Sequence, residues 1–352
     1  MRQILSSLPI LVAIAGFSGA AHAQAFFSTA KTFTLTQRCP ATTSISGSNP
    51  IYFNAGTAFR AVGENKTPGG THAYIEGSGF SGRRWMALSC GTYGTGGSTG
   101  GGGSTGGGTV ALPSGTSVFF DSVNNPVSGL AYGSPADVTP PAPTLNDFDK
   151  AVNTFCGAPG TVTSSTGFKT LINTNSAVRD RIKAAVGGSL VSGRTTTTQF
   201  VDDLANVWYV AKGFDHVLCG EPVVGGSIGG LHFHGRYLDL QTKGLAGRLI
   251  NNTSREEVVP GVIYTMGVKM KVGNGEAQSP VKGYGYTLNA EEILTIVTKA
   301  YKANPNTSST SQACNLRVTD DGKTFTTVFV AKQGGVRTFY PDATPGSNST
   351  CR

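Results

Sequence analysis

Charged side chains are scarce in this sequence. They make up 14% of the 352 residues, against about 25% in average soluble proteins, whereas glycine is abundant at 49 residues. Beyond the N-terminus, no apolar run approaches the roughly 18 residues of a membrane-spanning helix. Hydrophobic residues, at 38%, still suffice for a folded core, which argues against a wholly disordered chain. The length of 352 residues predicts two domains.

Closely spaced cysteine pairs are also absent. No CxxC motif occurs among the six cysteines, so neither a thiolate zinc site nor a thioredoxin-like redox site is indicated. An even number of cysteines in an exported protein favours disulfides. A free catalytic thiol at Cys219 is the less favoured alternative. We predict pairing within domains: Cys39 with Cys90, Cys156 with Cys219, and Cys314 with Cys351.

The N-terminus has the features of an export signal. Arg2 supplies a positive charge, residues 4–17 form a short apolar stretch, and Ala21-His22-Ala23 matches the small-x-small pattern of a signal peptidase site. We therefore expect cleavage near Ala23, removal of residues 1–23 and secretion, either extracellular or periplasmic. Removing Arg2 changes the formal charge from 28 − 20 = +8 to 27 − 20 = +7. Such a basic protein is attracted to polyanions, with nucleic acid foremost.

A glycine-rich stretch divides the rest of the chain. Gly, Ser and Thr dominate its first part and prolines its end, so we predict a linker region over residues 92–143. Before it, residues 24–91 place β-branched and aromatic residues between turn signals, which predicts a small β-rich module. After it, residues 144–352 form the second predicted domain.

The second domain combines helical and strand patterns. Apolar residues recur at helical spacing in three segments between residues 145 and 208. After residue 213 alternating patterns predict strands, including a hairpin over 325–340. One later helix is capped by Asn289 with Glu292 at its third position. These patterns predict an α+β domain with leading helices.

Histidine is rare, and its distribution is the main clue to function. The chain has five histidines, of which His216, His232 and His234 fall in one short segment. Gly229 and Gly230 lie in the same segment and allow close approach of backbone to a ligand. A single histidine is more often structural than functional, but three in one glycine-rich segment favour chemistry.

Two imidazoles in a basic protein suit the cleavage of RNA. One imidazole takes the proton of the 2′-hydroxyl while another protonates the departing 5′-oxygen. Imidazole titrates near neutral pH, so both protonation states are available together. A lysine near the phosphate stabilises the charge that develops on the non-bridging oxygens. Such a site needs no metal.

The motifs around these histidines resemble the EndoU family of endoribonucleases, which has coronavirus, eukaryotic and bacterial members. The resemblance rests on four landmarks in the family's order: His216-Val-Leu-Cys-Gly-Glu221, Gly229-Gly230-Leu231-His232, Lys282 before an Asn289-capped helix, and Val336-Arg337-Thr338-Phe339-Tyr340-Pro341. It spans residues 145–341 and implies two antiparallel sheets that form the active-site cleft. It says nothing about the N-terminal module.

The resemblance also implies the roles of three residues. His216 is the expected general acid, His232 the expected general base, and Lys282 the cation that stabilises the transition state. The implied reaction cleaves single-stranded RNA, 3′ of uridine in the viral members, and leaves 2′,3′-cyclic phosphate and 5′-hydroxyl ends. No cofactor is required, and stimulation by a divalent cation such as Mn is left open.

Further residues are candidates for binding and orientation. Thr338 and Tyr340 are two apart on a predicted strand and share a face, where the tyrosine ring can stack on a base. The uridine-selecting hydroxyl residue of the viral members has no clean counterpart, and Thr287 is the best candidate. Substrate contacts are thus predicted for Thr338, Tyr340, Thr287, Gly229, Gly230 and His234, although His234 could instead be a surface residue. Glu221 and Asp215 are predicted behind the histidines, with a structural role for Glu221 equally favoured.

Two other functions compete with this interpretation. A metal-dependent phosphodiesterase would use His216, His232, His234 and Glu221 as ligands, but the sequence lacks HExxH. A non-catalytic protein that binds nucleic acid or surface polymers is the second. RNA is the expected partner in the favoured interpretation. Export is also compatible with a role as a toxin that has a partner inhibitor or immunity protein. The sequence predicts no oligomeric state.

Overall fold

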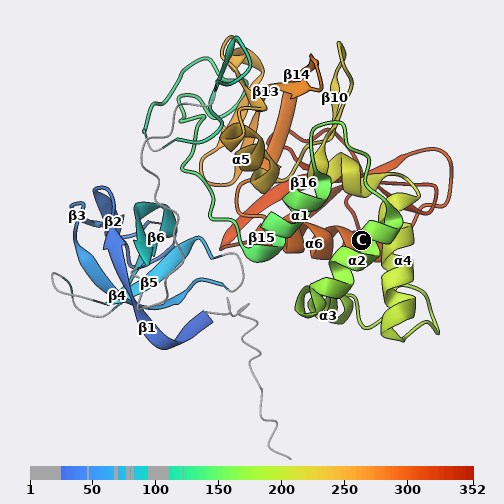
Figure 1. The fold of residues 1–352 in the computed structure, drawn as a ribbon, viewed down its shortest axis with the longest axis horizontal. Coiled ribbons are helices and arrows are strands. Elements are labelled where there is room, and N and C mark those ends of the chain that lie inside the picture. Colours follow the sequence, from blue (N-terminus) through green and yellow to red (C-terminus); the bar gives the residue numbers. More distant parts are fainter. Residues whose placement is uncertain are drawn as a thin grey trace, which may run out of the picture.

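The computed structural model describes residues 25–45, 47–66, 70–76, 80, 83–93, 111–121 and 123–352. The expected export signal and most of the glycine-rich stretch lie outside these residues. Figure 1 shows a small β module, coloured blue, beside a larger domain of helices and sheets. Within the described ranges, no helix is long and apolar enough to cross a membrane.

The N-terminal module is built from antiparallel strands. Its main sheet has the order β6-β5-β4-β1-β7. The strands are β1 (Ala25–Leu35), β4 (Ala58–Glu64), β5 (His72–Glu76), β6 (Arg84–Ala87) and β7 (Gly91–Tyr93), and a separate pair joins β2 (Cys39–Ala41) to β3 (Ile51–Phe53). Phe33, Phe59 and Ile75 form its core, and the predicted Cys39–Cys90 disulfide closes it.

Residues that were expected to belong to the linker pack into the larger domain. Strand β8 (Thr116–Ser117) pairs with β11 (Ala246–Leu249), and Phe119 and Phe120 are buried. The structure therefore places residues 111–121 in the larger domain, unlike the linker predicted over 92–143. The surrounding Gly- and Pro-rich composition is typical of a linker, so the sequence did not indicate that Phe119 and Phe120 pack into a core.

Helices and one sheet enclose the first core of the larger domain. The helices are α1 (Asp147–Cys156), α2 (Ser165–Thr174), α3 (Ser176–Ala185), α4 (Thr197–Tyr209) and α6 (Ala290–Ala303). The three helical segments predicted from periodicity correspond to α1, α3 and α4, whereas α2 was not predicted. Asn289 and Glu292 form the expected capping box of α6. Buried apolar faces of these helices pack on the sheet β15-β16-β17, with β15 (Gln312–Asp320), β16 (Lys323–Lys332) and β17 (Gly335–Pro341).

A second sheet carries the other core. It joins β12 (Glu257–Val259), β13 (Ile263–Val272), β11 and β8, and β14 (Gly275–Gly285) pairs with β13. Helix α5 (His234–Thr242) packs on this sheet through Tyr237 and Leu240. The domain is thus α+β with two main antiparallel sheets, as expected, and β14 of one contacts β17 of the other. The hairpin predicted over residues 325–340 is the pair β16–β17.

All three predicted disulfides form, and none of the six cysteines is free. The Cys156–Cys219 bond, with 5.3 Å between its Cα atoms, joins α1 to the segment that carries His216. This pairing also removes the alternative of a free thiol at Cys219. The Cys314–Cys351 bond ties the C-terminal residues to β15.

The β module contacts the larger domain around Lys66. The Nζ atom of Lys66 lies 2.6 Å from Glu292 Oε1 and 3.3 Å from Asp320 Oδ2. The neighbouring Asn65 donates to Asp321 at 3.0 Å. Burial alone would lower the pKa of Lys66, but the surrounding carboxylates outweigh it and raise this pKa above its usual value. The two units are therefore joined by an ion cluster near the start of α6.

Candidate active site

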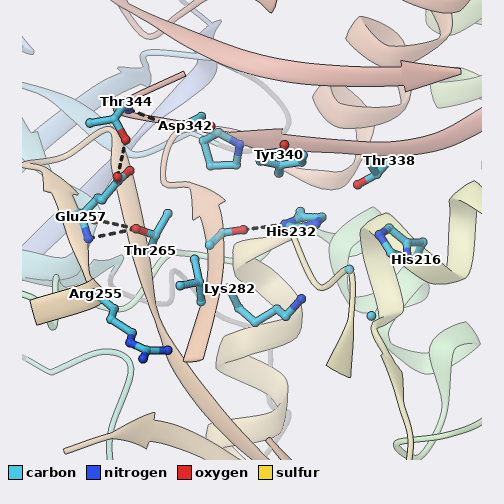
Figure 2. A pocket seen from close by; sticks show the side chains of 15 residues that line it. His216, His232, Arg255, Glu257, Thr265, Lys282, Thr338, Tyr340, Asp342 and Thr344 are labelled. Carbon is cyan, nitrogen blue, oxygen red and sulfur yellow. Dashed lines mark hydrogen bonds between the residues drawn. The ribbon is translucent and has the colours of Figure 1, made fainter. Parts of the chain in front are cut away.

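A pocket of about 470 Å³ opens between β14 and β17. It is lined by seven of the residues predicted from sequence: His216, Gly229, Gly230, His232, Lys282, Thr338 and Tyr340. Figure 2 shows the labelled side chains of His216, His232, Lys282, Thr338 and Tyr340, which approach from separate segments of the chain. The remaining candidates, Asp215, Glu221, Thr287 and His234, do not line it.

His216 lies on a π-helical turn, η2 (Asp215–Cys219), which the Cys156–Cys219 disulfide anchors. Its Nδ1 atom donates to Glu221 Oε2 at 2.6 Å, so Nε2 is the nitrogen left for a substrate. The same Oε2 atom accepts from Nη2 of Arg337 at 3.0 Å. Burial alone would raise the pKa of Glu221, but the hydrogen bonds and charges of His216 and Arg337 prevail and lower it to about 2. Glu221 thus stays ionised behind the imidazole.

Gly230 allows the backbone segments that carry His216 and His232 to lie against each other. It has φ +62°, and a Cβ atom at this position would lie 1.7 Å from the carbonyl oxygen of His216. The same carbonyl accepts from the backbone nitrogen of Leu231 at 2.8 Å, and His232 N donates to Val217 O at 2.8 Å. Only glycine fits here, because any side chain would collide with the backbone that it must contact.

His232 is held between the two cores. Leu231 packs into the core with α5, while Phe233 packs into the core with α1, so the residue between them is directed to the seam. Its Nδ1 atom is 2.9 Å from the carbonyl oxygen of Gly283. Because a carbonyl only accepts, Nδ1 carries the hydrogen, which leaves Nε2 as the basic atom.

The environment of His232 keeps its ring neutral. Burial lowers the pKa to about 3, and the nearby charges of His216 and Lys282 act in the same direction, against the hydrogen bond to Gly283. The ring centroids of His216 and His232 are 6.0 Å apart. Two imidazoles therefore face one space, each with one nitrogen fixed by a protein acceptor.

Lys282 supplies a cation to this space. It lies on β14 opposite Met266 of β13, one residue before Gly283. Figure 2 shows its amino group directed toward the two histidines. It forms no ion pair with any residue in the part of the chain that the structure describes. Burial lowers the pKa of this amine.

Thr338 and Tyr340 share one face of β17, as their spacing predicts. The Tyr340 ring lies next to His232, with 5.6 Å between ring centroids and an interplanar angle of 34°. The Thr338 hydroxyl is buried and has no hydrogen-bond partner within the described residues. This strand therefore offers an aromatic surface and a hydroxyl beside the histidines.

His234 and Thr287 are directed away from the pocket. His234 is neither exposed nor at the pocket, since it is 4% exposed and its Nδ1 atom donates to the carbonyl oxygen of Tyr286 at 3.0 Å. The extended segment assumed beyond His232 ends at Phe233, where α5 begins, and this turns the next side chain away. Thr287 is buried in the connection from β14 to α6, where its carbonyl oxygen accepts from Lys66.

Asp215 and Glu221 lie behind the histidine at position 216. Glu221 holds the His216 ring directly, as described above. The carboxylate of Asp215 accepts instead from the backbone nitrogen of Thr163, and so fixes the start of the π-helical turn. The two acidic residues thus position different parts of the same segment.

Among the pocket residues that the sequence analysis missed, five have polar or charged side chains: Arg255, Glu257, Thr265, Asp342 and Thr344. Asp342 continues the two-residue period of Thr338 and Tyr340, a signal that was available. Glu257 and Thr265 reach the pocket only because β12 and β13 pair with each other. No local pattern reports such a pairing.

One of the four ligands required by a metal-dependent phosphodiesterase, His234, lies apart from the other three. Across the described ranges, no group of three or more His, Cys, Asp or Glu side chains is arranged to hold a metal ion. The hydrogen bond from His234 to Tyr286 directs that imidazole away from His232. The observed cluster instead combines two imidazoles, one amine and hydroxyl groups.

One family model matches the segment that carries these pocket residues. Residues 211–343 match the family model of the bacterial EndoU nuclease. A solved structure similar to this chain is endoribonuclease Nsp15 encoded by Middle East Respiratory Syndrome Coronavirus, at 14% identity and a TM-score of 0.33. The match covers 79% of this chain and 58% of that chain. A search of curated proteins finds no match. The resemblance to EndoU nucleases that the sequence motifs indicate is confirmed by the family model.

Proposed function

We propose that this protein is an endoribonuclease that cleaves single-stranded RNA by attack of a 2′-hydroxyl on the adjacent phosphate. The observation that carries the proposal is the convergence of His216, His232 and Lys282 on one pocket. The match to a nuclease family over residues 211–343 supports it independently.

The hydrogen bonds support one assignment of the two proton transfers. Nε2 of neutral His232 takes the proton of the 2′-hydroxyl as the 2′-oxygen bonds to phosphorus. Protonated His216 gives its Nε2 proton to the 5′-oxygen as the phosphorus–5′-oxygen bond breaks. The products are a 2′,3′-cyclic phosphate and a 5′-hydroxyl, and the proton that His232 gained returns to solvent. Glu221 holds Nδ1 of His216, so that Nε2 is directed to the departing oxygen.

Lys282 and β17 account for the remaining needs of the reaction. The amine of Lys282 stabilises the negative charge that develops on the non-bridging oxygens. The ring of Tyr340 stacks on a base next to the scissile phosphate, while Thr338 offers its unpaired hydroxyl. A base can stack in this way only when it leaves a helix, which favours single-stranded RNA. Thr287 lies outside the pocket, so selection of uridine would depend on other residues.

Secretion is part of the proposal. Three disulfides support it, because such bonds persist in oxidising compartments. If the secreted nuclease acts as a toxin, the cell that produces it needs an inhibitor or immunity protein. The chemistry assigned to His216, His232 and Lys282 requires no metal ion, and a divalent cation such as Mn would act on RNA binding.

A defined RNA oligonucleotide tests the proposal. The purified protein is incubated with the RNA in excess chelator, and the ends are identified by mass spectrometry and sequencing. We expect cyclic-phosphate ends with the wild type and none with His216→Ala or His232→Ala. RNA binding should survive in both variants, which separates a nuclease from a binding protein. Cleavage that needs added metal, or products with 3′-hydroxyl ends, would contradict the mechanism.

A further inference from the structure

The pocket has two ends of opposite charge. His216, His232 and Lys282 form one end, whereas Glu257 and Asp342, with Arg255 beside them, line the other. Figure 2 shows the two groups on opposite sides of Tyr340 and Thr265. The proposed reaction uses the first end and gives no role to the second.

The strand register sets the distance between the two ends. Glu257 of β12 is opposite Thr265 of β13, and Thr265 is opposite Gly283 of β14. Neighbouring strands lie about 4.8 Å apart, so Glu257 is roughly 10 Å from Gly283, the residue that binds His232. One nucleotide spans about this distance, from its phosphate to the far edge of its base. A nucleotide with its phosphate at the histidines therefore points its base edge toward the carboxylates.

Neither carboxylate is neutralised by a cation. Glu257 accepts from the backbone nitrogen of Ala343 at 3.3 Å and from the Thr344 hydroxyl at 2.5 Å. Asp342 accepts from the backbone nitrogen of Thr344 at 2.9 Å. Within the described ranges, neither forms a salt bridge, and Figure 2 shows the Arg255 guanidinium directed away from them.

These carboxylates keep room for further donors. A carboxylate has about four lone-pair positions, of which the contacts above use two at Glu257 and one at Asp342. Burial raises the pKa of Asp342, as does the nearby charge of Glu257. A ligand that brings N–H donors between them would relieve this repulsion, whereas a phosphate or a carbonyl oxygen would add to it.

We propose that Glu257 and Asp342 make this end of the pocket selective for a base with an exocyclic amino group. The inference rests on the proposed function and adds a substrate preference to it. Cytosine and uracil differ at position 4, where cytosine presents an amino donor and uracil a carbonyl acceptor. Carboxylate side chains accept from the cytosine amino group. The ring of Tyr340 stacks on either base, so the carboxylates decide between them.

Oligonucleotides with a single cleavable position test this preference. A DNA strand carrying one ribonucleotide, either ribocytidine or ribouridine, is cut only at that position, because only there is a 2′-hydroxyl present. We expect kcat/KM for ribocytidine to exceed that for ribouridine at least tenfold in the wild-type protein. A ratio near or below one would overturn the inference.

Isosteric variants connect the preference to the two carboxylates. Asp342→Asn and Glu257→Gln keep the size of each side chain but replace one acceptor by a donor, so each should reduce the cytidine-to-uridine ratio several-fold or more. Asp180→Asn, an exposed position on α3, is the matched control and should leave both rates unchanged. An unchanged ratio in both pocket variants, with folding verified by circular dichroism, would refute the assignment.

The outcomes separate this inference from the proposed function. Absence of cleavage at both ribonucleotides would refute the nuclease activity itself. Cleavage that favours uridine would leave the nuclease standing and refute only the base selection. A preference that disappears in chelator would show that the carboxylates hold a divalent cation, which would also overturn the inference.

Discussion

The carbonyl oxygen of Gly283 accepts the Nδ1 hydrogen of His232 at 2.9 Å. This contact fixes which nitrogen of the buried ring is basic. It also ties the histidine to the strand that carries Lys282, since Gly283 is the next residue along β14. The base and the cation of the proposed reaction are thus positioned by one strand.

The pH dependence of activity should reflect the burial of His232. Its pKa is lowered from 6.5 to about 3, so the base stays unprotonated and competent throughout the mildly acidic range. Because kcat/KM reports groups of the free enzyme, we expect its acid limb well below pH 6. Initial rates between pH 4 and pH 8 on a short oligonucleotide measure it. An acid limb near pH 6.5 would contradict the assignment of His232 as the base.

Stability should fall in the same acidic range. A histidine with a lowered pKa binds fewer protons in the folded protein than in the unfolded chain. The contribution of His232 to stability is therefore complete above pH 6.5 and declines as the pH falls toward 3. Glu221, lowered from 4.5 to about 2, contributes above pH 4.5 and loses this contribution as the pH falls toward 2. Buried carboxyl groups with raised pKa values, such as Asp149, act in the opposite direction, so each contribution is measured as a difference between variants. Urea unfolding of the wild type, His232→Ala and Glu221→Gln is compared at several pH values, and a wild-type advantage that does not shrink on acidification would contradict that assignment.

Lys282→Ala should slow cleavage by about 2–4 kcal/mol of barrier, the cost of losing an electrostatic stabiliser at the transition state. Lys282→Arg should retain part of the rate. It should also move the alkaline limb upward, since burial lowers the pKa of the lysine and arginine stays charged. Lys243→Ala changes an exposed lysine at the C-terminal end of α5 that does not line the pocket, so this control variant should cut RNA at the wild-type rate. If Lys282→Ala and Lys243→Ala slowed cleavage equally, the rate would depend on the net charge of the protein and not on a cation at position 282.

Gly230→Ala should abolish activity and lower stability. A Cβ atom would meet the carbonyl oxygen of His216 at 1.7 Å, and φ +62° adds a strain of about 1–3 kcal/mol. Gly225→Ala, in the turn between β9 (Glu221–Pro222) and β10 (Ile228–Gly229), is a matched control, because it has φ +71° but nothing within 4 Å of the added atom. It should cost stability from strain alone. Thermal unfolding and cleavage rates of both variants separate strain from collision, and a fully active Gly230→Ala would contradict the geometry.

Sequence patterns predicted those helices, caps and hairpins whose formation depends on residues close together in the chain. The cap of α6 needs only Asn289 and its neighbour three residues on, and the β16–β17 hairpin needs only its turn. The paired histidines were found from their clustering in one segment and from the resemblance to the EndoU family. Glu257 was not predicted as a pocket residue, because it reaches the pocket only through the pairing of β12 with β13. His234 shows the opposite failure, since a local assumption of extended chain was replaced by the start of a helix.

The contact between the two units should depend on Lys66. Its amine is surrounded by the carboxylates of Glu292, Asp320 and Asp321, so Lys66→Ala leaves several buried acidic groups without their cation. Breaking a buried pair in this way costs about 3–5 kcal/mol. Arg60→Ala is the control within the same module. It removes an exposed pair with Glu76, for which an effect of at most about 1 kcal/mol is expected.

The consequence for activity follows from the place of this cluster. Glu292 lies in the first turn of α6, and the Thr287 carbonyl that accepts from Lys66 stands five residues after Lys282. Loss of the contact should loosen the connection that leaves β14, and so reduce kcat more than it alters KM. Calorimetry should resolve a separate, earlier transition of the β module in Lys66→Ala. A single unshifted transition with normal kcat would show that the module and the nuclease domain are energetically independent.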